Sequence, residues 1–173
     1  MRKIKFIKIF LTVVTFSFLS SCNGDNEPID PTIILNPQGS ILPIVFKVGV
    51  NGQTYTASQV SAIFVGGNII MSASRGTEQE SFQIDIKGTS TGTYQTNTSV
   101  IGYRSGIAQP LFSSVNPSDA LSYTGRIIIS SINTVNKRIS GNFEFTGYNN
   151  NGNITLTKEF TNGVFTNIPY TIN

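Results

Sequence analysis

Hydrophobic and polar residues alternate with a period of two along several stretches of this chain, and few folds are compatible with such alternation. It is clearest in three segments: SFQIDIKG (81–88), ISGNFEFTG (139–147) and GNITLTKEF (152–160). Successive side chains of a β-strand point to opposite faces, so each segment is typical of a strand with one buried face. The residues expected to face the core are Phe82, Ile84, Ile86, Phe143, Phe145, Ile154, Leu156 and Phe160. Lys158 falls on the same face as Ile154, which indicates that the third strand leaves the core near its end.

Turn-forming residues separate the strand-like segments at short intervals. Asn51 and Gly52 lie between two such segments, and this pair favours a type I′ hairpin turn because both central residues of that turn need positive φ. Further turns are expected within residues 65–72, 74–81 and 148–155, which are rich in glycine, asparagine and serine.

No segment shows a sustained helical period, and only Asn116–Leu121 has the composition of a short helical turn. The loose connection at 89–99 contains GTYQT (92–96), which is expected to form a short strand. Many short strands separated by turns predict an all-β fold, either an antiparallel β-sandwich or a partly closed β-barrel built from hairpins. We expect residues 43–173 to form this single β domain.

The first 21 residues have the parts of a secretory signal peptide. MRKIKFIK (1–8) carries four basic residues, and the apolar run that follows ends in small residues. A membrane-spanning helix needs roughly 20 apolar residues, so a run of about twelve favours a signal peptide over a transmembrane segment. We therefore predict that residues 1–21 direct export.

Leu19, Ser20, Ser21 and Cys22 resemble the lipobox of bacterial lipoproteins, in which a leucine and two small residues precede an invariant cysteine. The resemblance implies cleavage before Cys22 and acylation of that residue, the only cysteine of the chain. Two or more acyl chains anchor a protein stably to a membrane. The expected partner is therefore a membrane, and the expected location is the outer membrane, with the cell surface and the periplasmic face both open. The alternative is an incidental cysteine after an ordinary signal peptide.

Residues 22–42 are predicted to contain the lipidated cysteine and a flexible tether. The segment mixes proline, glycine and acidic residues, and twenty flexible residues span roughly 25 Å on average. TIIL (32–35) could instead form a first edge strand. Asp25 and Glu27 loosely resemble the acidic surface-export signal of some Bacteroidota-type lipoproteins.

Two short motifs stand near the C-terminus, ISG-x-F-x-F (139–145) and TNG-x-F (161–165). Together with VNGQTYTA (50–57), they resemble an uncharacterised family of Bacteroidota-type lipoproteins. The resemblance implies a secreted all-β domain, and it brings no known activity or binding residues with it.

Composition excludes several classes of function. Four of the 12 Lys and Arg residues leave with the signal peptide, so eight remain against nine Asp and Glu, and a nucleic-acid partner is not expected. Histidine is absent, which excludes Ser-His-Asp and Cys-His nucleophiles and histidine zinc sites. We expect no catalytic residues, no metal site and no cofactor.

Carboxylates are the groups that could still support catalysis, as paired acids do in glycosidases. The six acids of the domain are Glu78, Glu80, Asp85, Asp119, Glu144 and Glu159. Glu78 and Glu80 are assigned to a turn, and Asp85, Glu144 and Glu159 to outward strand faces, where a charge is solvated. Residues 148–153 lack the carboxylates of a calcium loop, so a hairpin turn is expected there. Tyr103 and Arg104 are the candidate ligand surface, because an aromatic ring with a polar tip suits a sugar or a peptide.

The leading hypothesis is a lipid-anchored envelope protein whose β domain is a non-catalytic binding or structural module, with a glycan or a protein as ligand. One alternative is a carboxylate-dependent hydrolase of envelope or dietary polymers. The other is a carrier of a small apolar ligand, which would need an open interior lined by the inward Phe and Ile residues.

Overall fold

The computed structural model describes residues 33–35, 41–77, 79–119, 121–122, 124–151 and 154–173 of the 173-residue chain. The described residues belong to one compact unit and form strands but no helix. The strands are β1 (Ile33–Leu35), β2 (Ile41–Pro43), β3 (Val45–Val50), β4 (Gln53–Thr56), β5 (Gln59–Val65), β6 (Asn68–Arg75), β7 (Glu80–Ile86), β8 (Gly92–Gln95), β9 (Val100–Arg104), β10 (Phe112–Ser113), β11 (Gly125–Asn133), β12 (Arg138–Asn151) and β13 (Ile154–Ile172).

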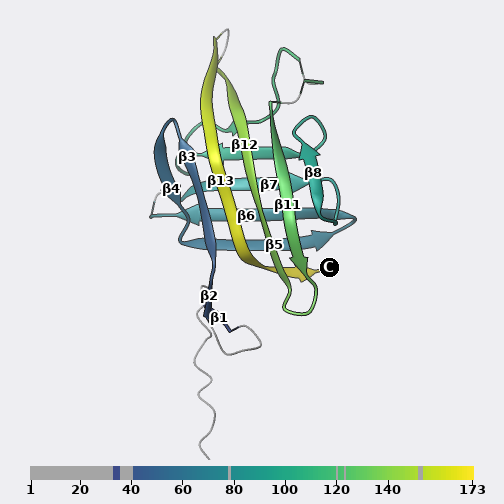
Figure 1. Ribbon diagram of the computed structural model, residues 1–173. Helices are drawn as coiled ribbons and strands as arrows, with labels where there is room; N and C mark the ends of the chain where they lie inside the picture. The colour runs from purple at the N-terminus through teal and green to yellow at the C-terminus, as the bar shows by residue number, and fades with distance from the viewer. Residues whose placement is uncertain (1–32, 36–40, 78, 120, 123, 152–153) are drawn as a thin grey trace, which may run out of the picture. The chain divides into compact units, whose positions relative to one another are not determined.

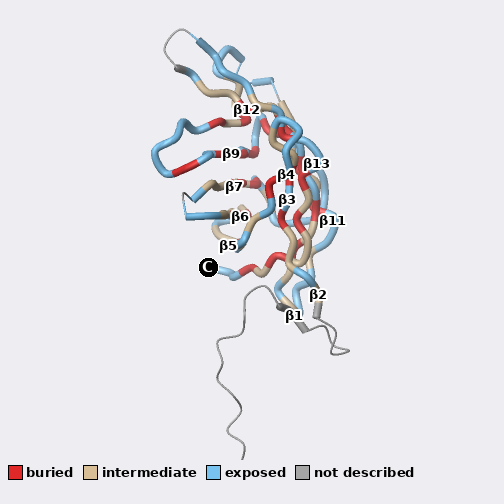
Figure 2. The backbone as a smooth tube through the Cα atoms, turned by 90° about the vertical axis from the view of Figure 1, so that its left-hand side faces the viewer, coloured by how far each residue is buried: buried red, intermediate tan, exposed pale blue. Residues whose placement is uncertain are grey.

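Strands β3 to β13 form one hydrogen-bonded sheet that folds over itself into two layers (Figures 1 and 2). The strand order is β4-β3-β13-β5-β6-β7-β9-β10-β12-β11-β8, and β12 also pairs with β13, so the sheet partly rings its core. The front layer contains β4, β3, β13, β12, β11 and β8, and the strands β5, β6, β7 and β9 cross behind it (Figure 1). The all-β prediction is confirmed. The pairings are antiparallel, except that β5 and β13 run parallel.

β1 and β2 form a separate two-stranded antiparallel sheet within the segment predicted to be a tether. TIIL therefore contributes a strand, as its alternative reading required, but that strand pairs with β2 and not with the main sheet. The Asn167 side-chain amide donates a hydrogen bond to the Pro43 carbonyl at 3.2 Å, which ties the end of β2 to β13. The remainder of 22–42 lies outside the described residues.

The hairpin predicted at Asn51 and Gly52 is confirmed, and the turn expected within residues 65–72 is also a two-residue hairpin. Asn51 and Gly52 connect β3 to β4 with φ values of 47° and 81°, as a type I′ turn requires. Gly66 and Gly67 connect β5 to β6 with φ values of 58° and 79°. GTYQT also supplies a strand, β8.

The short helical turn expected at Asn116–Leu121 is not a helix. The described residues there form two successive turns, closed by Asp119 N donating to Asn116 O and by Ser122 N donating to Asp119 O. The Asn116 and Asp119 side chains accept hydrogen bonds from nearby backbone amides. Such local bonds compete with helical ones, so each turn ends after one bond.

The period-two alternation correctly predicts the buried faces of β7 and of the middle of β12. Phe82, Ile84 and Ile86 are buried, as are Phe143 and Phe145. Large aromatic rings from both layers fill the space between them. The ring of Phe82, on the back layer, lies 4.8–6.2 Å from five others: Phe46, Tyr55, Tyr103, Phe143 and Phe160.

The third alternating segment is only partly buried, which corrects the prediction. Phe160 is buried, but Ile154 and Leu156 are 65% and 44% exposed. They belong to an arm, residues 149–151 of β12 and 154–157 of β13, which extends beyond the crossing strands (Figure 1). No second layer covers this part of the hairpin, so its apolar side chains stay in solvent. The strand thus starts outside the core and enters it at Phe160, the reverse of the expected direction.

β13 connects the two layers because it bends at two bulges. Asn162 and Asn167 both have φ of 54°, and at each position β13 has one residue more than β12 between paired positions. A β-bulge of this kind increases the local twist of a strand. After the second bulge β13 leaves the front layer and pairs with β5.

Candidate functional site

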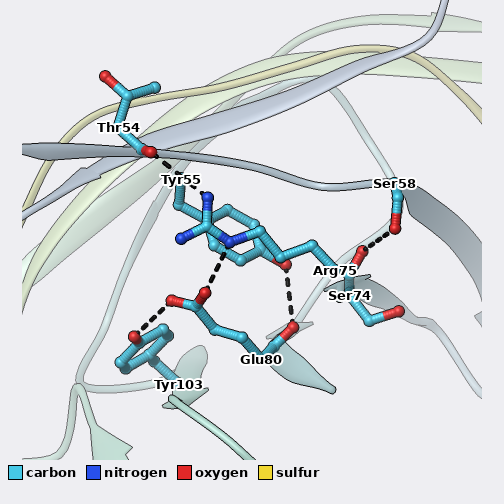
Figure 3. Close-up of polar contacts among 7 residues, drawn as sticks. All are labelled: Thr54, Tyr55, Ser58, Ser74, Arg75, Glu80 and Tyr103. Atoms are coloured by element: carbon cyan, nitrogen blue, oxygen red, sulfur yellow. Dashed lines mark hydrogen bonds and ion pairs between the residues drawn. The ribbon is translucent and has the colours of Figure 1, made fainter. Parts of the chain in front are cut away.

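Glu80 is the centre of a polar network between the layers (Figure 3). Its carboxylate accepts hydrogen bonds from the Tyr103 hydroxyl and from Arg75 Nε, both at 2.6 Å. Its backbone carbonyl accepts one from the Tyr55 hydroxyl at 3.2 Å. The Arg75 guanidinium carbon lies 4.5 Å from the centroid of the Tyr55 ring, and Nη1 donates to the Thr54 carbonyl at 3.4 Å.

The β6–β7 hairpin explains why this network forms. Arg75 and Glu80 are the paired residues next to the turn of this hairpin, and Glu80 lies on the same strand face as Phe82. The prediction that Glu80 belongs to a turn is therefore wrong: it is the first residue of β7, and its side chain is 19% exposed. The sequence does contain a signal for this orientation. Glu80 lies two positions before Phe82, and residues two apart on a strand share a face.

Burial raises the pKa of the Tyr55 hydroxyl well above its ordinary value of about 10, and the nearby Glu80 carboxylate raises it further. Burial also raises the pKa of Tyr103, with a second contribution from its hydrogen bond to Glu80. Both tyrosines therefore stay protonated at neutral pH and act as hydrogen-bond donors. The network binds β4 of the front layer to β6, β7 and β9 of the back layer, and we assign it a structural role.

Tyr103 and Arg104, the predicted ligand surface, point to opposite faces of β9. Tyr103 is buried beside Phe82 and Phe160, whereas Arg104 is exposed. Successive residues of a strand cannot line one groove on one face. The two side chains are therefore not brought together.

The structure brings a different set of polar side chains together on the outer face of the front layer. An open, shallow depression lies there across four strands. Its lining comes from β8, from the start of β11, and from β12 and β13: Gln95, Thr124, Gly125, Arg126, Glu144, Phe145, Thr146, Glu159, Phe160 and Thr161. We call this surface the outer-face depression. Its two phenylalanines have their rings in the core, and the polar groups that it presents to solvent are hydroxyls, an amide, a guanidinium and carboxylates.

Two carboxylates line this depression in different surroundings. Glu144 is half-exposed and forms an ion pair with Arg126, in which Nη2 lies 3.0 Å from Oε1. Glu159 is within hydrogen-bonding distance of the Thr146 hydroxyl, at 3.2 and 3.3 Å from its two oxygens. Asn51 fixes the backbone of Glu159 by donating to its carbonyl and accepting from its amide, both at 3.0 Å.

The outward orientation predicted for Glu144 and Glu159 is confirmed, but the sequence did not indicate that they share a depression. That proximity depends on β12 pairing with β11 on one side and β13 on the other. Diagonal neighbours on adjacent strands lie within reach of long side chains. The hairpin turn predicted at 148–153 places the two glutamates on neighbouring strands, but it does not predict that β11 and β8 lie beside them.

The other carboxylates of the domain lie elsewhere. Asp85 pairs with Lys87 at 2.9 Å on the outer face of β7. Asp119 is exposed, and hydrogen bonds from Ser122 and from the Leu121 amide lower its pKa. Glu78 lies outside the described residues. Within the described ranges, no group of three His, Cys, Asp or Glu side chains is arranged to hold a metal ion.

The predicted signal peptide 1–21, the lipobox residues Leu19, Ser20 and Ser21, and the lipidation site Cys22 all lie outside the described residues. In the part of the chain that the structure describes, no helix has the length and apolar character needed to cross a membrane.

Comparison with known protein families identifies the family to which the chain is similar. A family model described as a domain of unknown function (DUF6252) matches residues 43–169. These residues include β3 to β12 and most of β13. Neither the curated proteins nor the solved structures yielded a match.

Proposed function

The chain belongs to the family described as a domain of unknown function (DUF6252), and since that description assigns no activity, we propose a function from the chain's own residues. The proposal is a lipid-anchored envelope protein whose β domain binds a partner without catalysis. The outer-face depression is the binding surface. The observation that carries the proposal is that four paired strands hold hydrogen-bonding side chains around an exposed hollow, while inward rings fill the core. Binding surfaces on rigid strands are more precise than those on loops.

The anchor in this proposal is Cys22, processed after Leu19, Ser20 and Ser21. The Cys22→Ala variant should lose incorporation of a labelled fatty acid and move from the membrane fraction to the soluble fraction, because its lipid chains would be missing. Fatty-acid labelling followed by membrane fractionation measures both effects. A Cys22→Ala protein that stays labelled and membrane-bound would refute lipid anchoring.

Protease treatment of intact cells would then locate the domain, with a periplasmic protein as the control. Loss of the domain with the control intact would indicate the cell surface. Protection until the outer membrane is broken would indicate the periplasmic face. The lipid-anchor proposal leaves both outcomes open.

Binding at the depression is tested with a substitution that fills it. The full chain in detergent is screened against polysaccharides, peptides and envelope proteins, and each binder is retested with Thr161→Arg. Thr161 is exposed and lines the depression, so a long side chain there should reduce binding at least tenfold. Ser72→Arg, on an exposed position of β6, is the matched control and should bind normally. Equal binding by both variants would contradict the proposed surface.

The second candidate function is hydrolysis, and one observation supports it. Glu144 and Glu159 line one depression, and the paired acids of a glycosidase likewise share one site. A general acid needs a desolvated environment, whereas Glu144 is 51% exposed and contacts a guanidinium. Binding is therefore the better-supported function. If the chain hydrolyses a polysaccharide, and Glu144→Gln and Glu159→Gln each abolish that turnover, hydrolysis replaces binding as the conclusion.

The carrier hypothesis has less support. The inward aromatic side chains pack against one another, with Phe145 and Phe160 stacked at 4.2 Å between ring centroids. An apolar ligand between the layers would have to displace these contacts, each worth about 0.5–1.5 kcal/mol.

A further inference from the structure

The carboxylates of the described residues differ in whether they form an ion pair with a basic side chain. Glu80, Asp85 and Glu144 each form an ion pair, with Arg75, Lys87 and Arg126. Among the described residues, no lysine or arginine nitrogen lies within 4.0 Å of the Glu159 carboxylate. The depression therefore contains two carboxylates and one guanidinium, and the unneutralised charge is on Glu159.

The surroundings of Glu159 position this charge for an external partner. The Thr146 hydroxyl has one proton, so it can donate to only one carboxylate oxygen at a time, and the other lone pairs stay available. Asn51 forms hydrogen bonds with both the amide and the carbonyl of Glu159, so the backbone that carries the carboxylate is fixed before binding. A prepositioned acceptor of this kind suits a charged donor, because charge-assisted hydrogen bonds are the stronger ones.

The rest of the lining favours a protein segment over a sugar. Sugar rings stack on exposed aromatic faces, but both phenylalanines of the depression are buried. Gln95 and Thr161 are exposed and offer the donors and acceptors that peptide amides need. The open form of the depression, spread over four strands, also fits an extended segment lying across the sheet.

From these observations we propose that the outer-face depression binds a polar protein segment through a lysine or arginine side chain, which pairs with Glu159. This inference rests on the proposed binding function and specifies its ligand class. The contact is at a partly exposed surface, so it contributes modestly to affinity, and its attraction weakens as salt rises.

The test uses the full chain in detergent micelles and three synthetic decapeptides with the same glycine, serine and threonine background. One peptide carries three arginines, one carries three glutamates, and one carries no charge. Amide chemical shifts of the ¹⁵N-labelled protein report where each peptide binds. We expect the arginine peptide to shift the amides around Glu144–Thr146 and Glu159–Thr161, and to bind more weakly as salt rises.

Matched variants separate this contact from a general charge effect. Glu159→Gln should weaken binding of the arginine peptide about three- to fivefold, as expected for an exposed ion pair. Asp85→Asn removes one carboxylate of the same charge from the opposite layer and should leave the affinity unchanged. Equal weakening by both variants, or equal binding of all three peptides, would overturn the inference.

The failure of this inference is distinguishable from that of the proposed function. If a neutral peptide or a soluble glycan changes the amide chemical shifts of the depression while the arginine peptide does not, the basic-segment inference fails and the binding function stands. A free amine such as spermidine that competes as well as the arginine peptide would overturn the assignment to a protein segment. If no probe binds at the depression in either experiment, both proposals fail.

Discussion

Two glycines of the C-terminal motifs are required because aromatic rings approach the backbone closely. A Cβ atom on Gly141 would lie 2.1 Å from the Ile128 carbonyl oxygen and 2.4 Å from the Phe165 ring. A Cβ atom on Gly163 would lie 2.6 Å from the Phe143 carbonyl oxygen and 2.7 Å from the ring of the same residue. In these motifs the glycines therefore make room for the phenylalanines, which explains both residue types by packing instead of ligand binding.

Gly163→Ala should destabilise the domain by about 1–3 kcal/mol, because the added methyl group overpacks the core against Phe143. Urea denaturation of the full chain measures the change. Gly102→Ala is the control, since its Cβ would meet the exposed and flexible Leu111 side chain at 3.2 Å. A Gly163→Ala protein as stable as Gly102→Ala would contradict the packing argument.

The arm shows that a strand can have an alternating pattern without a core beneath it. Ile154, Leu156 and Phe160 occupy alternate positions on one face of β13, but Phe160 alone is covered by the second layer. Near the base of the arm, the Asn149 side chain donates to the Leu111 carbonyl at 2.8 Å. Strand pairing and this contact hold the arm, so burial contributes little to it.

Substitutions along this face should therefore have very different effects on stability. Ile154→Thr and Leu156→Thr should each change the free energy of unfolding by less than about 0.5 kcal/mol, as surface substitutions usually do. Phe160→Ala should cost about 3–5 kcal/mol, since it leaves a cavity among the rings of Phe82, Tyr103 and Phe145. Thermal unfolding followed by circular dichroism compares the three. A large loss of stability for Ile154→Thr would contradict this prediction, because it would mean that the Ile154 side chain is buried.

At the scale of the molecule, two features join the layers at different places. β13 passes from the front layer to β5 of the back layer after its bulges. The Glu80 network links β4 of the front layer to β6, β7 and β9 of the back layer through hydrogen bonds. Aromatic packing fills the space between them. The two layers are therefore joined by the pairing of β13 with β5 at one place and by a partly buried polar cluster at another.

The tyrosines of this network should make the domain sensitive to alkali. Below about pH 10 both hydroxyls are protonated in the folded and unfolded states, so their contribution to stability is constant. Above that pH the unfolded chain releases the two protons first, because the folded-state pKa values are raised. Stability should then fall by up to about 1.4 kcal/mol per pH unit for each tyrosine.

Absorbance at 295 nm and circular dichroism, recorded together from pH 8 to 12.5, test this prediction. We expect two of the six tyrosines to ionise only as the fold is lost. The Tyr55→Phe variant should show one late tyrosine fewer and a shallower loss of stability above pH 10. Ionisation of all tyrosines before any unfolding would refute the assignment.

Some features of the candidate site were predictable from the sequence and others were not. The outward positions of Glu144 and Glu159 follow from the alternation of their strands. The turn predicted at 74–81 conceals the inward position of Glu80, because the run of turn-forming residues continues to the start of β7. Tyr103 and Arg104 are adjacent in sequence, and adjacency on a strand puts their side chains on opposite faces.

The all-β class, the hairpin at Asn51 and Gly52, and the buried faces of β7 and of the middle of β12 can be predicted from the amino-acid sequence alone. These depend on interactions between near neighbours: alternation with period two, and positive φ at Asn51 and Gly52. The pairing of strands across long sequence separations, such as β11 with β8 and β13 with β5, depends on the packing of the whole domain. That packing also decides that Ile154 is exposed, Glu80 is enclosed and Glu159 shares a depression with Arg126. Burial is a property of what covers a residue, and no local pattern specifies the covering layer.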